Sequence, residues 1–81
     1  MLEDIGAGLQ RGQDVRTLSG VRVGRVDRVL AREFELVTDT WSLRMAKECI
    51  YLVDHGVVTL VCESKGLPSY IRSASRRRPP P

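Results

Sequence analysis

The stretch from Ser19 to Leu30 (SGVRVGRVDRVL) constrains the fold of this chain most, because it places two glycines four residues apart in a run rich in valine and arginine. A helix would fit the recurrence of Val23, Val26 and Leu30 at spacings of three or four. Valine, however, is stiff at χ1 and fits a pleated surface better, and glycine inside a helix costs about 1 kcal/mol relative to alanine. The stretch is therefore predicted to form a β-strand.

The two glycines of this stretch have different predicted roles. Gly20 supplies a positive φ for the turn that precedes the strand. Gly24 lies within the strand, where a glycine marks a bulge or the close approach of another backbone. The spacing of the valines supports this interpretation. Val21 and Val23 share one face of the strand, and Val26 joins that face only if the alternation shifts by one residue near Gly24, as it does at a bulge.

Apolar alternation and turn signals predict further strands on both sides of this one. They are expected at residues 14–18, 34–36, 43–46 and 57–63. The turn at 54–56 ends in Gly56, which supplies a positive φ. Five or six strands joined by short turns indicate an all-β fold, a small antiparallel β-barrel that removes exposed sheet edges by closing on itself.

Several of these motifs are similar to those of a known family. Residues 12–15 (GQDV), 19–20 (SG) and 23–27 (VGRVD) resemble the opening of PRC-barrel domains, and the likeness extends over roughly residues 8–63, with a one-turn segment at 48–50. Ala46 departs from the pattern, since many members carry a proline there. The resemblance implies a small SH3-like β-barrel that serves as an assembly or docking module, as in a photosynthetic reaction-centre subunit and a ribosome-binding rRNA-processing factor.

Charge divides the chain into two parts. The 81 residues are enough for one small domain, and their formal charge is +3. Residues 65–81 carry five bases and no acid, whereas residues 1–64 carry eight bases against ten acids and are mildly acidic. We therefore predict a barrel domain at 1–64 and a flexible, disordered tail rich in arginine and proline at 65–81.

The charge distribution also selects candidate contact residues. The predicted polyanion contacts are the arginines of the tail, Arg72, Arg76, Arg77 and Arg78. A second set of bases, Arg22, Arg25, Arg28 and Arg32, is interspersed with Asp27, Glu33 and Glu35, so it is interpreted as a solvated, charge-balanced face.

Trp41 is the candidate contact for a protein partner. It is the only tryptophan and falls in a predicted loop over residues 38–42, where an aromatic ring covers much area at low entropy cost. The alternative, which the small size of the core favours, is that the ring caps one end of the barrel.

No combination of residues in the sequence indicates a catalytic site. Cys49 and Cys62 are thirteen positions apart and form no C-x-x-C pair, so they are expected to be buried structural thiols. His55 stands alone in a turn and is expected to be exposed to solvent. The sequence therefore predicts no enzyme, no cofactor, no metal and no small-molecule substrate.

Two functional hypotheses remain. The first is a non-enzymatic interaction module that binds a protein partner or a second copy of itself. The second is an RNA-associated or ribosome-associated accessory protein that uses the basic tail. The longest apolar run, Val57–Cys62, is far short of the ~20 residues that span a bilayer, and the acidic start does not resemble a secretory signal, so a cytoplasmic location is expected.

Overall fold

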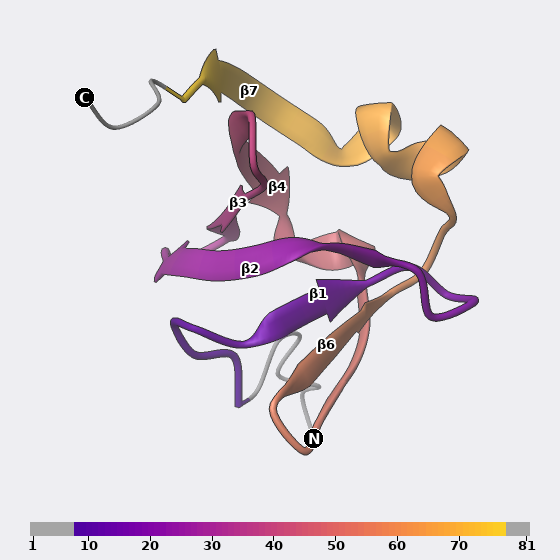
Figure 1. The fold of residues 1–81 in the computed structure, drawn as a ribbon. Coiled ribbons are helices and arrows are strands. Elements are labelled where there is room, and N and C mark those ends of the chain that lie inside the picture. The colour runs from indigo at the N-terminus through magenta and orange to yellow at the C-terminus, as the bar shows by residue number, and fades with distance from the viewer. Residues whose placement is uncertain (1–7, 78–81) are drawn as a thin grey trace.

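Seven strands form one sheet in the order β5-β6-β1-β2-β3-β4-β7 in the computed structural model, which describes residues 8–77 (Figure 1). The strands are β1 (Asp14–Arg16), β2 (Arg22–Val29), β3 (Glu33–Val37), β4 (Trp41–Ala46), β5 (Ile50–Asp54), β6 (Val57–Leu60) and β7 (Ile71–Arg76). Two 3₁₀-helical segments, η1 (Lys47–Cys49) and η2 (Ser64–Tyr70), connect β4 to β5 and β6 to β7. The predicted all-β class and the single turn near residue 48 are confirmed.

The sheet differs from the predicted barrel in three respects. It has seven strands rather than five or six, and it is open, with β5 and β7 as its two edges. It is also not wholly antiparallel, because β1 pairs with β6 in parallel, with Val15 opposite Val58. Val15 and Val58 are both fully buried and belong to the same core cluster, so this pair joins β6 to the core through β1.

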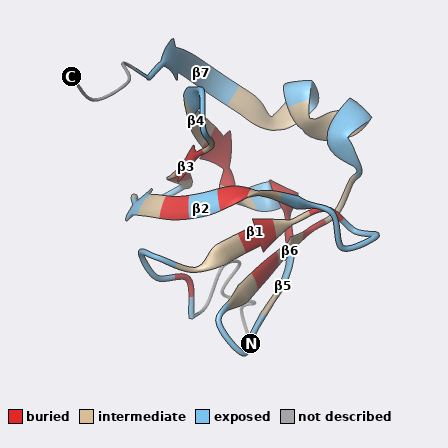
Figure 2. Cartoon of the chain, in the orientation of Figure 1, coloured by how far each residue is buried: buried red, intermediate tan, exposed pale blue. Residues whose placement is uncertain are grey.

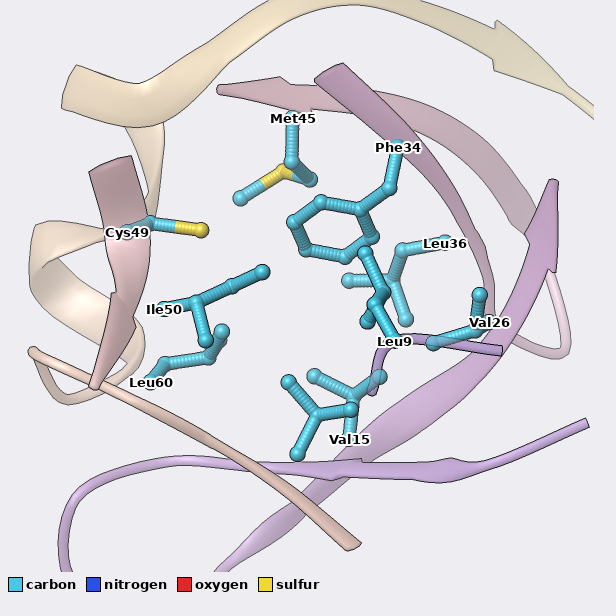
Figure 3. Close-up of a cluster of buried hydrophobic side chains, with 10 residues drawn as sticks. Leu9, Val15, Val26, Phe34, Leu36, Met45, Cys49, Ile50 and Leu60 are labelled. Carbon is cyan, nitrogen blue, oxygen red and sulfur yellow. The ribbon is translucent and has the colours of Figure 1, made fainter. Parts of the chain in front are cut away.

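The buried positions lie on several strands of the sheet, as the red segments of Figure 2 show. Figure 3 shows the aromatic ring of Phe34 among aliphatic side chains from both halves of the chain. The cluster of buried hydrophobic residues comprises Leu9, Val15, Val26, Phe34, Leu36, Met45, Cys49, Ile50, Val58 and Leu60. Because each large apolar side chain contributes about 1.5–3 kcal/mol when fully buried, this cluster supplies the main stabilisation.

The predicted turns and inward-facing residues are confirmed. Gly20 and Gly56 have φ values of +95° and +76°. His55 also has a positive φ of 51°, so both central residues of the β5–β6 turn adopt the conformation that two-residue hairpins require. In β3, Phe34 and Leu36 are both fully buried, as their alternation with Glu35 predicts.

Gly24 lies beside a bulge and also at the close approach of another backbone, the two features predicted for it. Opposite β1 the register slips so that Val23 is the extra residue directly beside Gly24, and opposite β3 it slips again at Asp27. A Cβ added to Gly24 would collide with the carbonyl oxygen of Val37 and lie 2.9 Å from Leu36 Cδ1. β2 and β3 therefore approach so closely at this point that only glycine fits.

The segment after Ser64 differs from the predicted disordered tail. Residues 64–70 form η2, and β7 pairs with β4 from Trp41 opposite Arg76 to Met45 opposite Ile71. The side chains that pack against the core from this segment are Leu67, Tyr70 and Ile71. The sequence does not indicate this strand, because β7 contains few apolar residues. It is held mainly by backbone pairing with β4. Arg78 and residues 79–81 lie outside the described part of the chain.

Replacement of Gly24 by valine is expected to lower the free energy of unfolding by about 3 kcal/mol, because the added atoms overlap backbone that cannot move away. Thermal or urea unfolding monitored by circular dichroism measures the effect. Arg25→Val is the matched control, since it places the same side chain at the adjacent, exposed position of β2. Equal stability of the Gly24→Val variant and the parent would contradict the close approach.

Deletion of residues 65–81 is expected to destabilise the fold, because it removes β7 and three partly buried apolar side chains worth about 1 kcal/mol each. Urea unfolding should therefore show a loss of about 3 kcal/mol. A chain that lacks only residues 78–81 serves as the control. If the long deletion unfolds at the same urea concentration as the parent, β7 does not stabilise the sheet.

Candidate functional site

A surface groove lies where the β3–β4 hairpin meets β2 and the residue that follows β7. It has a volume of about 480 Å³ and is lined by residues 22–25 of β2, residues 37–41 of the hairpin, and Arg77. We call it the Trp41 groove. In the sheet order, β2 and β7 are separated by three strand intervals, or about 14 Å along the sheet. The groove thus brings together residues of β2 with Arg77, which lies far from them in the sequence.

Hydrogen bonds to Thr38 hold the hairpin turn at the centre of the groove. The hydroxyl oxygen of Thr38 accepts hydrogen bonds from the backbone N–H of Trp41 at 2.9 Å and of Thr40 at 3.2 Å. The backbone N–H of Thr38 in turn donates to the carbonyl of Trp41 at 2.8 Å. Threonine favours such turns because its side chain can replace a backbone partner. The backbone of Trp41 is therefore fixed before any ligand arrives.

Trp41 does not cap the core. It is the first residue of β4 rather than part of a loop, is 43% exposed, and does not belong to the buried cluster. The sequence-based preference for a capping role is therefore wrong. A tryptophan whose backbone is anchored and whose ring remains accessible can offer an aromatic face to a partner.

Arg77 is docked on the hairpin turn. Its backbone N–H donates to the carbonyl of Thr40 at 2.7 Å, and its Nη1 donates to the carbonyl of Thr38 at 2.7 Å. Arg76 pairs opposite Trp41 in the β4–β7 ladder, so it lies beside the groove. Arg72 lies near the other end of β7, beyond Ser73, which pairs with Arg44. Of the four predicted polyanion contacts, the structure thus places two at Trp41 and one away from it, and Arg78 lies outside the described residues.

Two of the four β2-region arginines also line the groove, and the acids expected to neutralise them are paired elsewhere. Arg22 and Arg25 line it, whereas Arg28 and Arg32 do not. The predicted neutralising acids bind other bases, Asp27 contacting Arg11, and Glu33 and Glu35 contacting Arg44. All four arginines are exposed, as predicted for a solvated face, and their balance of charge stays a prediction.

The charges that line the groove are mostly positive. Arg22 contacts Asp14 at 3.4 Å, but Arg25 and Arg77 form no ion pair with any carboxylate of residues 8–77. Asp39 is the one acid among the lining residues. The guanidinium groups of Arg25 and Arg77 thus retain hydrogen-bond donors for an anion. The sequence could not show this, because it does not reveal which base each acid contacts.

The other candidate groups show no sign of activation. Burial raises the pKa of the Cys49 thiol to about 12, with a further contribution from Cys62, so Cys49 is a poor nucleophile. The pKa of Cys62 is also raised, by burial and by the adjacent carboxylate of Glu63. His55 is exposed and its Nδ1 lies 3.0 Å from Asp54. Within residues 8–77, no three His, Cys, Asp or Glu residues gather to hold a metal ion.

Comparison with protein-family models, with curated proteins and with solved structures finds no match for this chain. The PRC-barrel resemblance consequently stays a prediction based on short motifs. In the part of the chain that the structure describes, no helix is long and apolar enough to cross a membrane. The Trp41 groove itself is thus the main basis for a functional assignment.

Proposed function

We propose that this protein is a non-enzymatic binding module that holds an anionic partner in the Trp41 groove. The observation that carries the proposal is the meeting of an exposed tryptophan with arginines from β2 and from the end of β7. Guanidinium groups without carboxylate partners bind phosphate or carboxylate through charge-assisted hydrogen bonds. The PRC-barrel resemblance, which implies a docking role, agrees with a module of this kind.

The chemistry of the groove favours binding over catalysis. Its described lining offers guanidinium groups, threonines, one carboxylate and an indole ring, but neither histidine nor cysteine. A carboxylate or a threonine hydroxyl can also serve in catalysis, but it then needs a second, orienting group, and Asp39 makes no ion pair with any residue of 8–77. The arginines instead provide fixed positive charge, which attracts and orients an anion without changing it.

The arginines of the groove are expected to account for most of the affinity. Oligouridylate and polyglutamate serve as anionic test ligands, titrated at low and moderate salt and followed by the fluorescence of Trp41. The double variant Arg25→Gln/Arg77→Gln should bind oligouridylate at least about tenfold more weakly, and the slope of log affinity against log salt should fall by about 1.4.

The matched control is Arg28→Gln/Arg72→Gln, which removes the same charge outside the groove. Its affinity should stay within about threefold of the parent. If the two double variants bind equally weakly, the charge acts diffusely and the groove is not the site. Failure of both ligands to bind the parent protein would overturn the proposed function itself.

A second candidate function, self-association, is favoured by β5, which is an edge strand of the sheet formed by residues 8–77. Tyr51 and Leu52 on this edge strand are 66% and 50% exposed. Open edges bearing apolar side chains are templates for pairing with another strand. Asp54 is the only charged residue of β5, and in an antiparallel pairing centred on Leu52 it lies opposite Ile50 of the second copy, so two copies can pair across a two-fold axis without placing like charges opposite each other.

Leu52→Lys is expected to abolish this self-association, because like charges would then face each other across the paired edges. Sedimentation equilibrium should show a concentration-dependent dimer for the parent protein and a dissociation constant at least about tenfold higher for the variant. Val21→Lys is the control, since Val21 is 57% exposed but lies outside β5. A monomeric parent, or equal weakening by both variants, would exclude the β5 edge as the contact.

A further inference from the structure

We infer that the ligand of the Trp41 groove is a single-stranded nucleic acid, with a base stacked on Trp41 and phosphates of the same strand held by Arg25 and Arg77. The inference rests on the proposed function and names the chemical class of the anionic partner. It is based on three features of the groove: the accessible indole, the placement of Arg25 and Arg77 on opposite sides of the hairpin, and the single carboxylate of Asp39.

The accessible indole distinguishes a nucleotide from a simple anion. Inorganic phosphate or an acidic peptide would use the arginines but leave the ring of Trp41 without a partner. A nucleobase offers a flat π-face, and stacking of bases on aromatic side chains is the common element of single-strand binding sites. Since the backbone of Trp41 is held by Thr38, the ring is presented from a fixed position, which lowers the entropy cost of stacking.

The positions of the arginines suit a chain rather than a single phosphate. Arg25 is supplied by β2 and Arg77 by the end of β7, on opposite sides of the hairpin that carries Trp41. A strand that crosses the hairpin can therefore meet one guanidinium group on each side while a base contacts the ring between them. Duplexes keep their bases stacked inside and cannot offer this face without unpairing.

Asp39 disfavours an acidic peptide. Its carboxylate lines the groove, and it forms no ion pair within residues 8–77. Charged side chains of an acidic peptide that filled the groove would lie close to this carboxylate and be repelled. In a nucleotide the charge sits on the phosphate and the base is neutral, so the base can lie near Asp39 while the phosphates stay at the arginines.

The test compares the full chain with Trp41→Leu and Trp41→Phe, using the anisotropy of labelled oligouridylate and oligothymidylate, the corresponding duplexes, and labelled polyglutamate. Trp41→Leu should weaken single-strand binding about tenfold, whereas Trp41→Phe, which retains a ring for stacking, should bind within about threefold of the parent. Because Trp41 is outside the core cluster, neither variant should change the thermal midpoint. The RNA and DNA arms identify which form of single strand binds more tightly.

The outcomes separate this inference from the function on which it rests. If single strands or polyglutamate bind through Arg25 and Arg77 but Trp41→Leu binds as tightly as the parent, stacking is absent and the nucleic-acid inference fails while the anion-binding module stands. The same holds if duplex or polyglutamate binds as tightly as the single strand. If none of these ligands binds the parent chain, both proposals fail.

Discussion

The close approach of β2 and β3 at Gly24 is the constraint on which the rest of this structure depends. The absence of a side chain at Gly24 leaves room for the carbonyl of Val37 and for the side chain of Leu36. This contact lets β3 pair with β2 while Leu36 enters the core, and it keeps the end of β3 against the arginine-bearing part of β2. One glycine thus links the packing of the core to the position of the groove.

On the other side of the groove, the pairing of β7 with β4 decides which residues line it. The β4–β7 ladder covers an edge of β4 that would otherwise be open, and the same ladder delivers Arg77 to the carbonyls of the β3–β4 turn. Ion pairs outside the groove involve the acidic residues of β2 and β3. Arg11 contacts Asp27, and Arg44 contacts Glu33 and Glu35, so these three acids make no ion pair with Arg25.

Local sequence signals determined much of the fold. Positive φ at Gly20 and Gly56, the inward alternation of Phe34 and Leu36, and the glycine-dependent approach at Gly24 all follow from short-range chemistry. Each of these features depends on the conformational freedom or the apolar phase of a few neighbouring residues. They indicate strands and turns, and they single out Trp41 by its residue type.

The partners of those strands were decided only by the tertiary structure. β7 carries one large apolar residue, Ile71, so its sequence hardly differs from that of a polar tail, and the strand exists because the edge of β4 offers backbone hydrogen bonds. The parallel contact of β1 with β6 and the meeting of Arg25, Trp41 and Arg77 are likewise long-range. Backbone hydrogen bonds leave little signature in side-chain patterns, which is why the sequence indicated most of the earlier strands and the candidate residue types but not β7, the sheet order or the groove.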